Sequence, residues 1–142
     1  MSSVFLDTDV VLDLYIERQP HHDIALKLLS KLKRTKIRCY TSPIVIANVH
    51  YILSKLEGRE YAIDKIRKLR KLISIAPIDN LIIDSAITSP YKDFEDSIQF
   101  HCAIKNNVNI FITRNIRHYP KEQLRVSDPT QYLSTIETER IG

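Results

Sequence analysis

The sequence predicts an α/β fold in which a central, mainly parallel sheet is covered by helices. Segments with the apolar patterns of strands and of helices alternate along the whole chain, and this alternation is typical of parallel sheets. Short apolar runs at 4–6 and 108–113 indicate two buried strands. No linker, repeat or low-complexity segment divides the 142 residues. We therefore expect a single domain over residues 1–142, which is long enough to bury a core without disulfides or structural metal.

The first part of the chain alternates strand and helix. Behind the strand at 4–6, residues 10–16 can begin a helix. Asp23 then introduces an amphipathic helix with one apolar stripe, formed by Ile24, Leu28 and Leu32. Residues 37–40 alternate weakly and indicate a second strand.

Two longer helices are expected next. Ser42 can cap the first, because its side chain can accept a hydrogen bond from an unpaired amide, and Pro43 at the first helical position loses no hydrogen bond. This helix, at 44–56, is apolar on most sides and is expected to be buried. The second, at 60–73, has apolar residues at helical spacing with basic residues between them, which predicts a surface helix with one wet face.

The C-terminal part continues the alternation. Its expected elements are a short strand, two helices, two strands and a final helix, at 75–78, 79–87, 94–104, 108–113, 124–126 and from Asp128-Pro129 on. Pro77 interrupts the short strand, and Ser89-Pro90 ends the helix that begins at Asp79.

The composition permits a polyanionic partner without requiring one. The formal charge is +4, and the basic residues are bunched at 31–38 and 65–71, although such runs are usually solvated helix faces. Cys39 and Cys102 lie far apart in apolar surroundings, which predicts small core residues in a reducing compartment. No apolar stretch has the length of a membrane span, and an acid comes too early for a signal peptide. We expect no membrane association and a cytoplasmic location.

Two groups of acids are candidates for a metal site. Asp7 directly follows the first strand, and Asp96 belongs to a later cluster with Asp93 and Glu95. The carboxyl ends of parallel strands form the edge where ligands bind, and Mg²⁺ and Mn²⁺ are often held by one or two carboxylates plus waters. Asp7 and Asp96 can also be a helix cap and a charge near a helix N-terminus.

The segment 113–115 is a third candidate, because it follows another apolar strand. Thr113 or Asn115 can orient a metal-bound water or an acid, and Arg114 can neutralise a phosphate through two hydrogen bonds. The simpler interpretation is that Thr113 and Asn115 satisfy a tight turn.

Four motifs, in order through nearly the whole chain, resemble the PIN-domain family. They are Leu6-Asp7-Thr8-Asp9-Val10-Val11-Leu12-Asp13, Ile46-Ala47-Asn48-Val49-His50-Tyr51-Ile52-Leu53, Asp93-Phe94-Glu95-Asp96-Ser97-Ile98-Gln99 and Ile112-Thr113-Arg114-Asn115. The resemblance implies a three-layer α/β/α sandwich and a Mg²⁺- or Mn²⁺-dependent endoribonuclease, as in VapC-like toxins of type II toxin–antitoxin pairs. It also implies an RNA substrate, a homodimer, and a small antitoxin that covers the active-site groove.

The resemblance assigns roles to individual residues. Asp7 and Asp96 match the first and third acidic positions of the family and would hold the metal, with Asn115 and Asn48 positioning water. The substrate would be bound by Thr8, Thr113 and Arg114, and the basic runs at 31–38 and 65–71 would follow the RNA backbone.

Three positions depart from the family's pattern. Asn48 stands where many members have a glutamate, although one branch of the family, with asparagine in place of this acid, resembles this chain. Asn115 stands where other members have an aspartate, and His118 where the related branch usually has one more acid. An amide keeps an oxygen ligand but removes a negative charge, so a dication would be held less tightly and activity would be weak or lost.

Three accessory residues are considered. Asp9 would share the face of Asp7 if the first strand continued. Glu95 would point away from Asp96 on a helix. His118 is a candidate ligand or proton donor, or a surface histidine without a task.

Two other functions remain open. Asp7-Thr8-Asp9 behind a strand also resembles the nucleophile motif of haloacid-dehalogenase-type phosphatases, in which Asp7 would accept a phosphoryl group. That chemistry needs a downstream lysine and then an acidic pair behind a further strand, and after Thr113 only Asp128 stands at such a place. The second alternative is a catalytically weakened PIN-like domain that binds RNA or a protein.

Overall fold

The computed structural model describes residues 2–89, 93–120 and 122–141, with side chains up to residue 136. Five strands within these residues form one sheet in the order β3-β2-β1-β4-β5, and all neighbouring strands are parallel. The strands are β1 (Ser3–Leu6), β2 (Arg38–Thr41), β3 (Ser74–Ile75), β4 (Ile110–Ile112) and β5 (Arg125–Ser127). The predicted α/β fold with a parallel sheet is confirmed.

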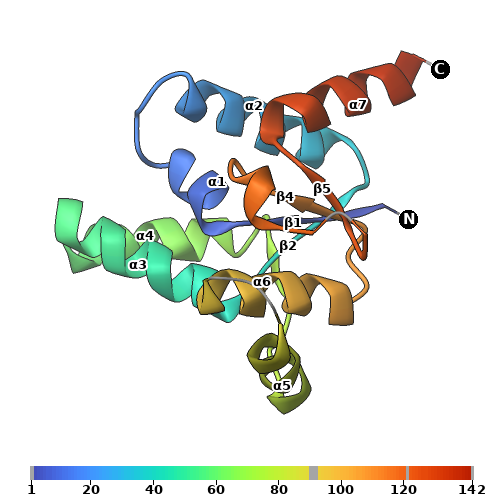
Figure 1. Cartoon of the computed structure of the whole chain (residues 1–142). Coiled ribbons are helices and arrows are strands. Elements are labelled where there is room, and N and C mark those ends of the chain that lie inside the picture. Colours follow the sequence, from blue (N-terminus) through green and yellow to red (C-terminus); the bar gives the residue numbers. More distant parts are fainter. Residues whose placement is uncertain (1, 90–92, 121, 142) are drawn as a thin grey trace.

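Helices cover both faces of the sheet, which completes the three-layer sandwich (Figure 1). They are α1 (Thr8–Asp13), α2 (His21–Arg34), α3 (Pro43–Glu57), α4 (Arg59–Leu69), α5 (Asn80–Thr88), α6 (Phe94–Lys105) and α7 (Pro129–Ile141). In Figure 1, α2 and α7 lie above the sheet, α3 and α6 lie below it, and α5 packs against α6.

The central strand explains why the first apolar run is so short and so uniform. All four residues of β1 are buried, because a parallel strand in the middle of a sandwich has helices on both faces. The rings of Phe5 in β1 and Phe111 in β4 stack at 5.1 Å, and Phe100 of α6 meets Phe111 edge-on at 5.3 Å. This aromatic core attaches α6 to the two strands that carry the candidate site.

The order of the strands creates a switch point at β1. The chain runs from β1 outward through β2 to β3, and then returns to the other side of β1 for β4 and β5. Ligands of open α/β sheets bind outside the carboxyl ends of the strands at such a point. Asp7 follows β1 and Thr113 follows β4, so both residues lie at this position.

The predicted elements are present, with shifts that have local causes. The strand expected at 75–78 ends at Ile75, and after Ala76 donates to the carbonyl of Thr41 at 2.8 Å, Pro77 has no amide to continue the pairing. The helix expected to reach Ile73 ends at Leu69. There the guanidinium of Arg70 donates to the carbonyl of Ile73 at 3.0 Å and stabilises a turn.

The expectation that helix 44–56 is buried on most sides is wrong. Ser42 caps α3 as expected, accepting from the amide of Val45 at 3.1 Å, but the buried face is a single stripe of Val45, Val49 and Leu53. Tyr51 and Leu56 are 59% and 60% exposed. Ile44 and Ile46 are partly buried beside this stripe, whereas Tyr51 and Leu56 face outward.

The basic run at 31–38 lies at the edge of the sheet opposite Asp7. It spans the end of α2 and the start of β2, and the starts of parallel strands form the amino edge. The run is therefore at the opposite edge from the carboxylates, and its predicted contact with the RNA backbone stays a prediction. In the second run, Arg67 and Lys68 are exposed on α4 and pair with Asp64 at 3.9 and 3.2 Å.

Other expectations can be compared directly. Cys39 and Cys102 are buried free thiols, as predicted. Pro90, expected to end a helix, lies outside the described residues, and α5 ends at Thr88. Among the described residues, every helix is too short or too polar to cross a bilayer.

Candidate carboxylate site

Asp7 is anchored from three sides at the end of β1. Its amide donates to the carbonyl of Ile112 at 3.0 Å, which continues the pairing with β4. Its Oδ1 accepts from the amide of Thr8 at 2.8 Å and caps α1. Its Oδ2 accepts from the hydroxyls of Thr113 and Tyr119, both at 3.0 Å. The side chain, 6% exposed, therefore has one orientation.

Asp9 also belongs to this site, and it does so from a helix and not from a strand. The strand stops at Leu6 and Asp9 lies in the first turn of α1, so the continued strand that was the condition for Asp9 to share the face of Asp7 is absent. Its Oδ2 accepts from the amide of Arg114 at 3.1 Å and from Nδ2 of Asn115 at 3.0 Å, with the hydroxyl of Thr113 at 3.4 Å. Its Oδ1 is buried and has no hydrogen-bond partner among the described residues.

Thr113 joins the two acids. Its hydroxyl lies within 3.0 Å of Asp7 Oδ2 and 3.4 Å of Asp9 Oδ2, and it also accepts from the amide of Asn115 at 3.1 Å. The turn after β4 thus satisfies itself, as the simpler interpretation requires, and at the same time orients two carboxylates. The hydrogen bonds of Thr113 therefore fit both predictions, a residue that orients an acid and a residue that satisfies a tight turn.

The pKa values of Asp7 and Asp9 are both raised, because ionising two buried, neighbouring carboxylates is unfavourable. Burial, followed by the charge of Asp9, raises the pKa of Asp7 from 3.8 to about 7. Burial also raises the pKa of Asp9, against the opposing effect of Arg114. Desolvated carboxylates side by side favour a bound cation, because a positive charge stabilises both ionised forms.

Asp96 approaches the site from α6. Asp93 caps this helix by accepting from the amide of Asp96 at 3.0 Å. The Oδ2 of Asp96 lies 3.5 Å from Nδ1 of His118, and its carboxylate also interacts with the hydroxyl of Tyr119. Burial, then the charges of Asp7 and Asp96, raise the pKa of that hydroxyl. Tyr119 therefore stays protonated between the two predicted metal ligands.

The amide at position 48 is paired with an acid. Nδ2 of Asn48 in α3 donates to Oε1 of Glu95 in α6. Glu95 thus turns toward α3, whereas Asp96 faces His118 and Tyr119, and the predicted divergence of the two acids is observed. A carboxylate in place of Asn48 would face Glu95 without a donor, so the amide suits its surroundings.

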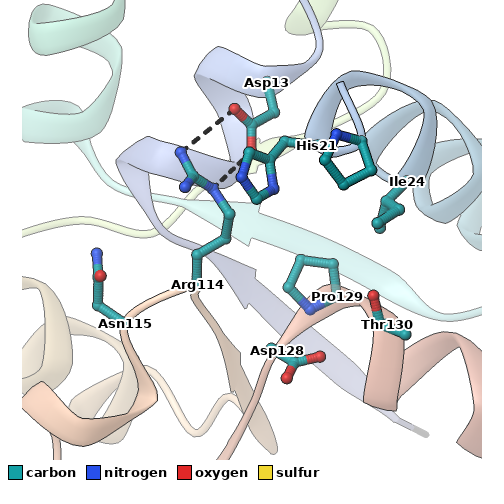
Figure 2. A pocket seen from close by; sticks show the side chains of 9 residues that line it. Asp13, His21, Ile24, Arg114, Asn115, Asp128, Pro129 and Thr130 are labelled. Atoms are coloured by element: carbon teal, nitrogen blue, oxygen red, sulfur yellow. Dashed lines mark hydrogen bonds and ion pairs between the residues drawn. The ribbon is translucent and has the colours of Figure 1, made fainter. Parts of the chain in front are cut away.

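Arg114 has a protein partner for its charge. Nε lies 2.8 Å from Oδ2 of Asp13 and Nη2 lies 3.4 Å from Oδ1 (Figure 2). Asp13 is 3% exposed, and a buried acid requires such a partner. The sequence suggested that Arg114 binds a phosphate through two hydrogen bonds. In this structure its guanidinium makes two such contacts with the carboxylate of Asp13.

Sequence reasoning missed Asp13 and Tyr119. Asp13 had a signal, because Asp9 and Asp13 stand four residues apart and share one face of a helix that is otherwise apolar. Tyr119 had none, because an aromatic residue after a loop is more often part of a core. Thr8 is half-buried, and the described contact near Asp7 is made by its backbone amide.

A hard divalent cation fits the donor set. Carboxylate and amide oxygens are the ligands that Mg²⁺ and Mn²⁺ prefer, and the buried Oδ1 of Asp9 is unpartnered among the described residues. The described residues contain no ready-made group of three or more His, Cys, Asp and Glu side chains for a metal. These residues therefore suit a cation that keeps several water ligands, as Mg²⁺ does.

Comparisons with known proteins agree with this architecture. The family model described as the PIN domain matches residues 3–117. Ribonuclease VapC1 of Aquifex aeolicus (strain VF5) is 26% identical over 121 residues, which cover 82% of this chain and 83% of the relative.

Solved structures share the fold at low sequence identity. A chain of VapBC2 from Rickettsia felis, bound to a DNA fragment from its promoter, has a TM-score of 0.68 and 19% identity, covering 89% of this chain and 98% of that chain. VapC20 of Mycobacterium tuberculosis, a toxin that cleaves the sarcin-ricin loop, has a TM-score of 0.62 and 14% identity, covering 84% and 91%. Since the family match runs from β1 past Asn115 and includes every acid of the site, this chain belongs to the PIN domain family.

Proposed function

We propose that this protein is a metal-dependent endoribonuclease and the toxin of a type II toxin–antitoxin pair. The observation that carries the proposal is the arrangement of Asp7 and Asp96 around the Tyr119 hydroxyl, at the carboxyl edge of the sheet and its switch point. The sequence relative is named a ribonuclease, which supports this chemistry. Membership of the PIN domain family leaves the phosphatase alternative without support.

In this proposal Asp7 and Asp96 hold Mg²⁺ or Mn²⁺, and the unpartnered oxygen of Asp9 is a further donor. A cation bound there supplies charge stabilisation at the scissile phosphate and an activated water, so that RNA is hydrolysed without a covalent intermediate.

The surrounding residues act on the carboxylates and on water. Thr113 and Tyr119 keep Asp7 in one orientation through hydrogen bonds of 3.0 Å. Asn115 donates to Asp9 at 3.0 Å and is exposed, which suits a residue that positions water. Asn48 acts more remotely, through Glu95. His118, whose Nδ1 lies 3.5 Å from Oδ2 of Asp96, is the candidate proton donor.

RNA binding is assigned to residues at the carboxyl edge. Thr8 and Arg114 border the site, whereas Thr113, predicted as a third RNA contact, is fully buried and acts through Asp7 and Asp9. The ion pair between Arg114 and Asp13 leaves Arg114 a weaker phosphate ligand than an unpaired arginine. Salt should weaken binding less than it would for a site with several free cations.

The alternative function is a binding module without catalysis. It is favoured by the two amides, each of which donates to an acid of the site: Asn48 to Glu95, and Asn115 to Asp9. These contacts give Glu95 and Asp9 hydrogen-bond donors that do not depend on a metal.

The partners in this proposal are RNA, a small antitoxin and a second copy of the chain, in the cytoplasm. Solved chains of similar fold come from complexes described as toxin–antitoxin or VapBC assemblies, which supports an antitoxin.

The deciding experiment incubates the purified protein with a mixed RNA substrate in Mg²⁺ or Mn²⁺, with and without chelator. Asp96→Asn is compared with Asp84→Asn, the same change at an exposed position of α5. Metal-dependent cleavage that is lost only in Asp96→Asn supports the nuclease. A folded protein, free of inhibitor, that binds RNA but does not cleave it favours the binding module.

A further inference from the structure

A cavity of about 350 Å³ opens next to the carboxylate site, between α2, the loop after β4 and the start of α7 (Figure 2). We propose that this cavity binds one unpaired base of the RNA, adjacent to the phosphodiester that is cleaved. The inference rests on the proposed ribonuclease function and adds a subsite that selects the sequence at the cleavage point.

The cavity and the carboxylate site share a wall. Asn115 lines the cavity and donates through Nδ2 to Asp9 at 3.0 Å. Arg114 also lines it, and its backbone amide donates to the same Asp9 oxygen at 3.1 Å. A phosphate at the carboxylates therefore has the neighbouring nucleotide of the same strand at the mouth of the cavity.

The lining has the chemistry of a base pocket. Pro20, Ile24 and Pro129 are apolar, and His21 adds a planar ring from the first turn of α2. Figure 2 shows Ile24 and His21 on the α2 side, facing Pro129 at the start of α7. Unpaired RNA bases are recognised by stacking on rings and apolar groups, and ligand cavities of a few hundred cubic ångströms are of the usual size.

Polar groups at the rim can read the edge of a base. Thr130, whose side chain carries a hydroxyl, belongs to the lining. The Nδ2 of Asn115 is engaged by Asp9, which leaves Oδ1 as the atom of this amide that can accept from a ring N–H or an amino group. Unpaired bases offer such donors, and a few placed polar groups are what fix the orientation of a ligand in a mostly apolar site.

The charges of the lining disfavour a phosphate. Arg114 is paired with Asp13 through contacts of 2.8 and 3.4 Å, and Asp128 adds a further negative charge. An anion would enter a lining with one more acid than arginine, whereas an uncharged base would not be repelled. The base, not the backbone, is therefore the part of RNA that suits this cavity.

The first test uses the isotope-labelled full chain with chelator and follows backbone amides by NMR. Each of the four ribonucleosides, and inorganic phosphate separately, is titrated as a probe. Saturable shifts at His21, Ile24 and Thr130 with at least one nucleoside, and none with phosphate, support the proposal. Phosphate shifting these amides as strongly as every nucleoside, or no nucleoside shifting them, overturns it.

The second test measures RNA binding in chelator, with oligonucleotides that lack the base at one position at a time. Ile24→Trp fills the cavity, and Leu26→Trp is its control, because Leu26 is 45% exposed on the same helix and is not part of the lining. We expect one abasic position to weaken binding to the native protein and to Leu26→Trp about tenfold, and to have no effect in Ile24→Trp. His21→Ala, which removes the ring without adding bulk, should show the same loss of discrimination. Equal abasic effects in all four proteins overturn the proposal.

These outcomes are separable from those of the cleavage assay. A protein that binds nucleosides in the cavity without cleaving RNA contradicts the nuclease and leaves a base-binding site. A protein that cleaves RNA while no nucleoside perturbs the cavity contradicts the base pocket and leaves the nuclease.

Discussion

The hydroxyl of Tyr119 donates to Oδ2 of Asp7 at 3.0 Å, between residues 112 positions apart in the sequence. The ring of Tyr119 packs against Phe111 at 4.6 Å and Phe100 at 5.3 Å. The aromatic core therefore determines where this hydroxyl stands, and through it the orientation of Asp7. The position of this carboxylate at the edge of the sheet therefore depends on packing in the interior of the protein.

Removing this hydroxyl should weaken the metal site without disturbing the core. Tyr119→Phe keeps the ring and deprives Asp7 of one of its donors, so we expect Mn²⁺ affinity to fall several-fold and stability to change by about 1–3 kcal/mol. Calorimetric titration with Mn²⁺ and urea unfolding measure the two effects. Tyr51→Phe, at a residue 59% exposed on α3, is the control. Native metal affinity in Tyr119→Phe would count against a positioning role.

The metal-free protein should lose stability as the pH rises toward neutrality. The pKa of Asp7 is raised from 3.8 to about 7 by burial and by Asp9, so the folded state holds a proton that the unfolded state has released. Its contribution is complete below about pH 4 and is lost as the pH rises through about 7. The melting temperature in chelator, measured from about pH 5 to pH 8, should fall, and Mg²⁺ should restore it at the upper end.

Asp7→Asn provides the control for this pH effect. Asparagine still caps a helix but does not titrate, so the melting temperature of the variant should depend less on pH. If the native protein and Asp7→Asn show the same slope, the effect belongs to other groups.

Breaking the ion pair between Arg114 and Asp13 should destabilise the fold strongly. The side chains are 26% and 4% exposed, and removing one partner of a buried pair costs about 3–5 kcal/mol. We expect Arg114→Gln to lose close to this amount in urea unfolding, and Arg114→Gln with Asp13→Asn to recover part of it.

The exposed ion pair between Lys68 and Asp64 is the control for this prediction. Lys68 and Asp64 are 65% and 47% exposed, so Lys68→Gln should change stability by less than about 1 kcal/mol. A comparably small loss in Arg114→Gln would show that Asp13 is hydrated without its partner, against the burial seen here.

Placing an acid at position 115 should lower the stability of the metal-free protein and raise its affinity for metal. Asn115→Asp removes the 3.0 Å donor to Asp9 and adds a like charge beside it, so the metal-free protein should melt at a lower temperature. The same added carboxylate should tighten Mn²⁺ binding about tenfold, because the cation gains one charged oxygen ligand.

The matched control is Asn80→Asp, at an exposed residue in the first turn of α5. It makes the same chemical change away from the site, where a negative charge at a helix N-terminus is favourable. Equal Mn²⁺ affinity in Asn115→Asp and the native protein would indicate that position 115 does not face the cation.

The sequence by itself determined the order and type of the elements. Apolar runs at 4–6 and 108–113, and the cap at Ser42-Pro43, are local signals, and the parallel sheet followed from their alternation. It also indicated Asp7 and Thr113 as neighbours, because both stand directly behind strands whose carboxyl ends meet at one edge. The boundaries moved where a single residue, such as Pro77, ended the backbone pairing.

Only the tertiary structure decided which side chains meet at that edge. Asp9 joins the site because the chain turns into α1 after Asp7, and Arg114 pairs with Asp13 because α1 lies against the loop after β4. Tyr119 reaches Asp7 through the packing of three aromatic rings. These contacts depend on the order of the strands and on the direction of each side chain, and neither is contained in local periodicity.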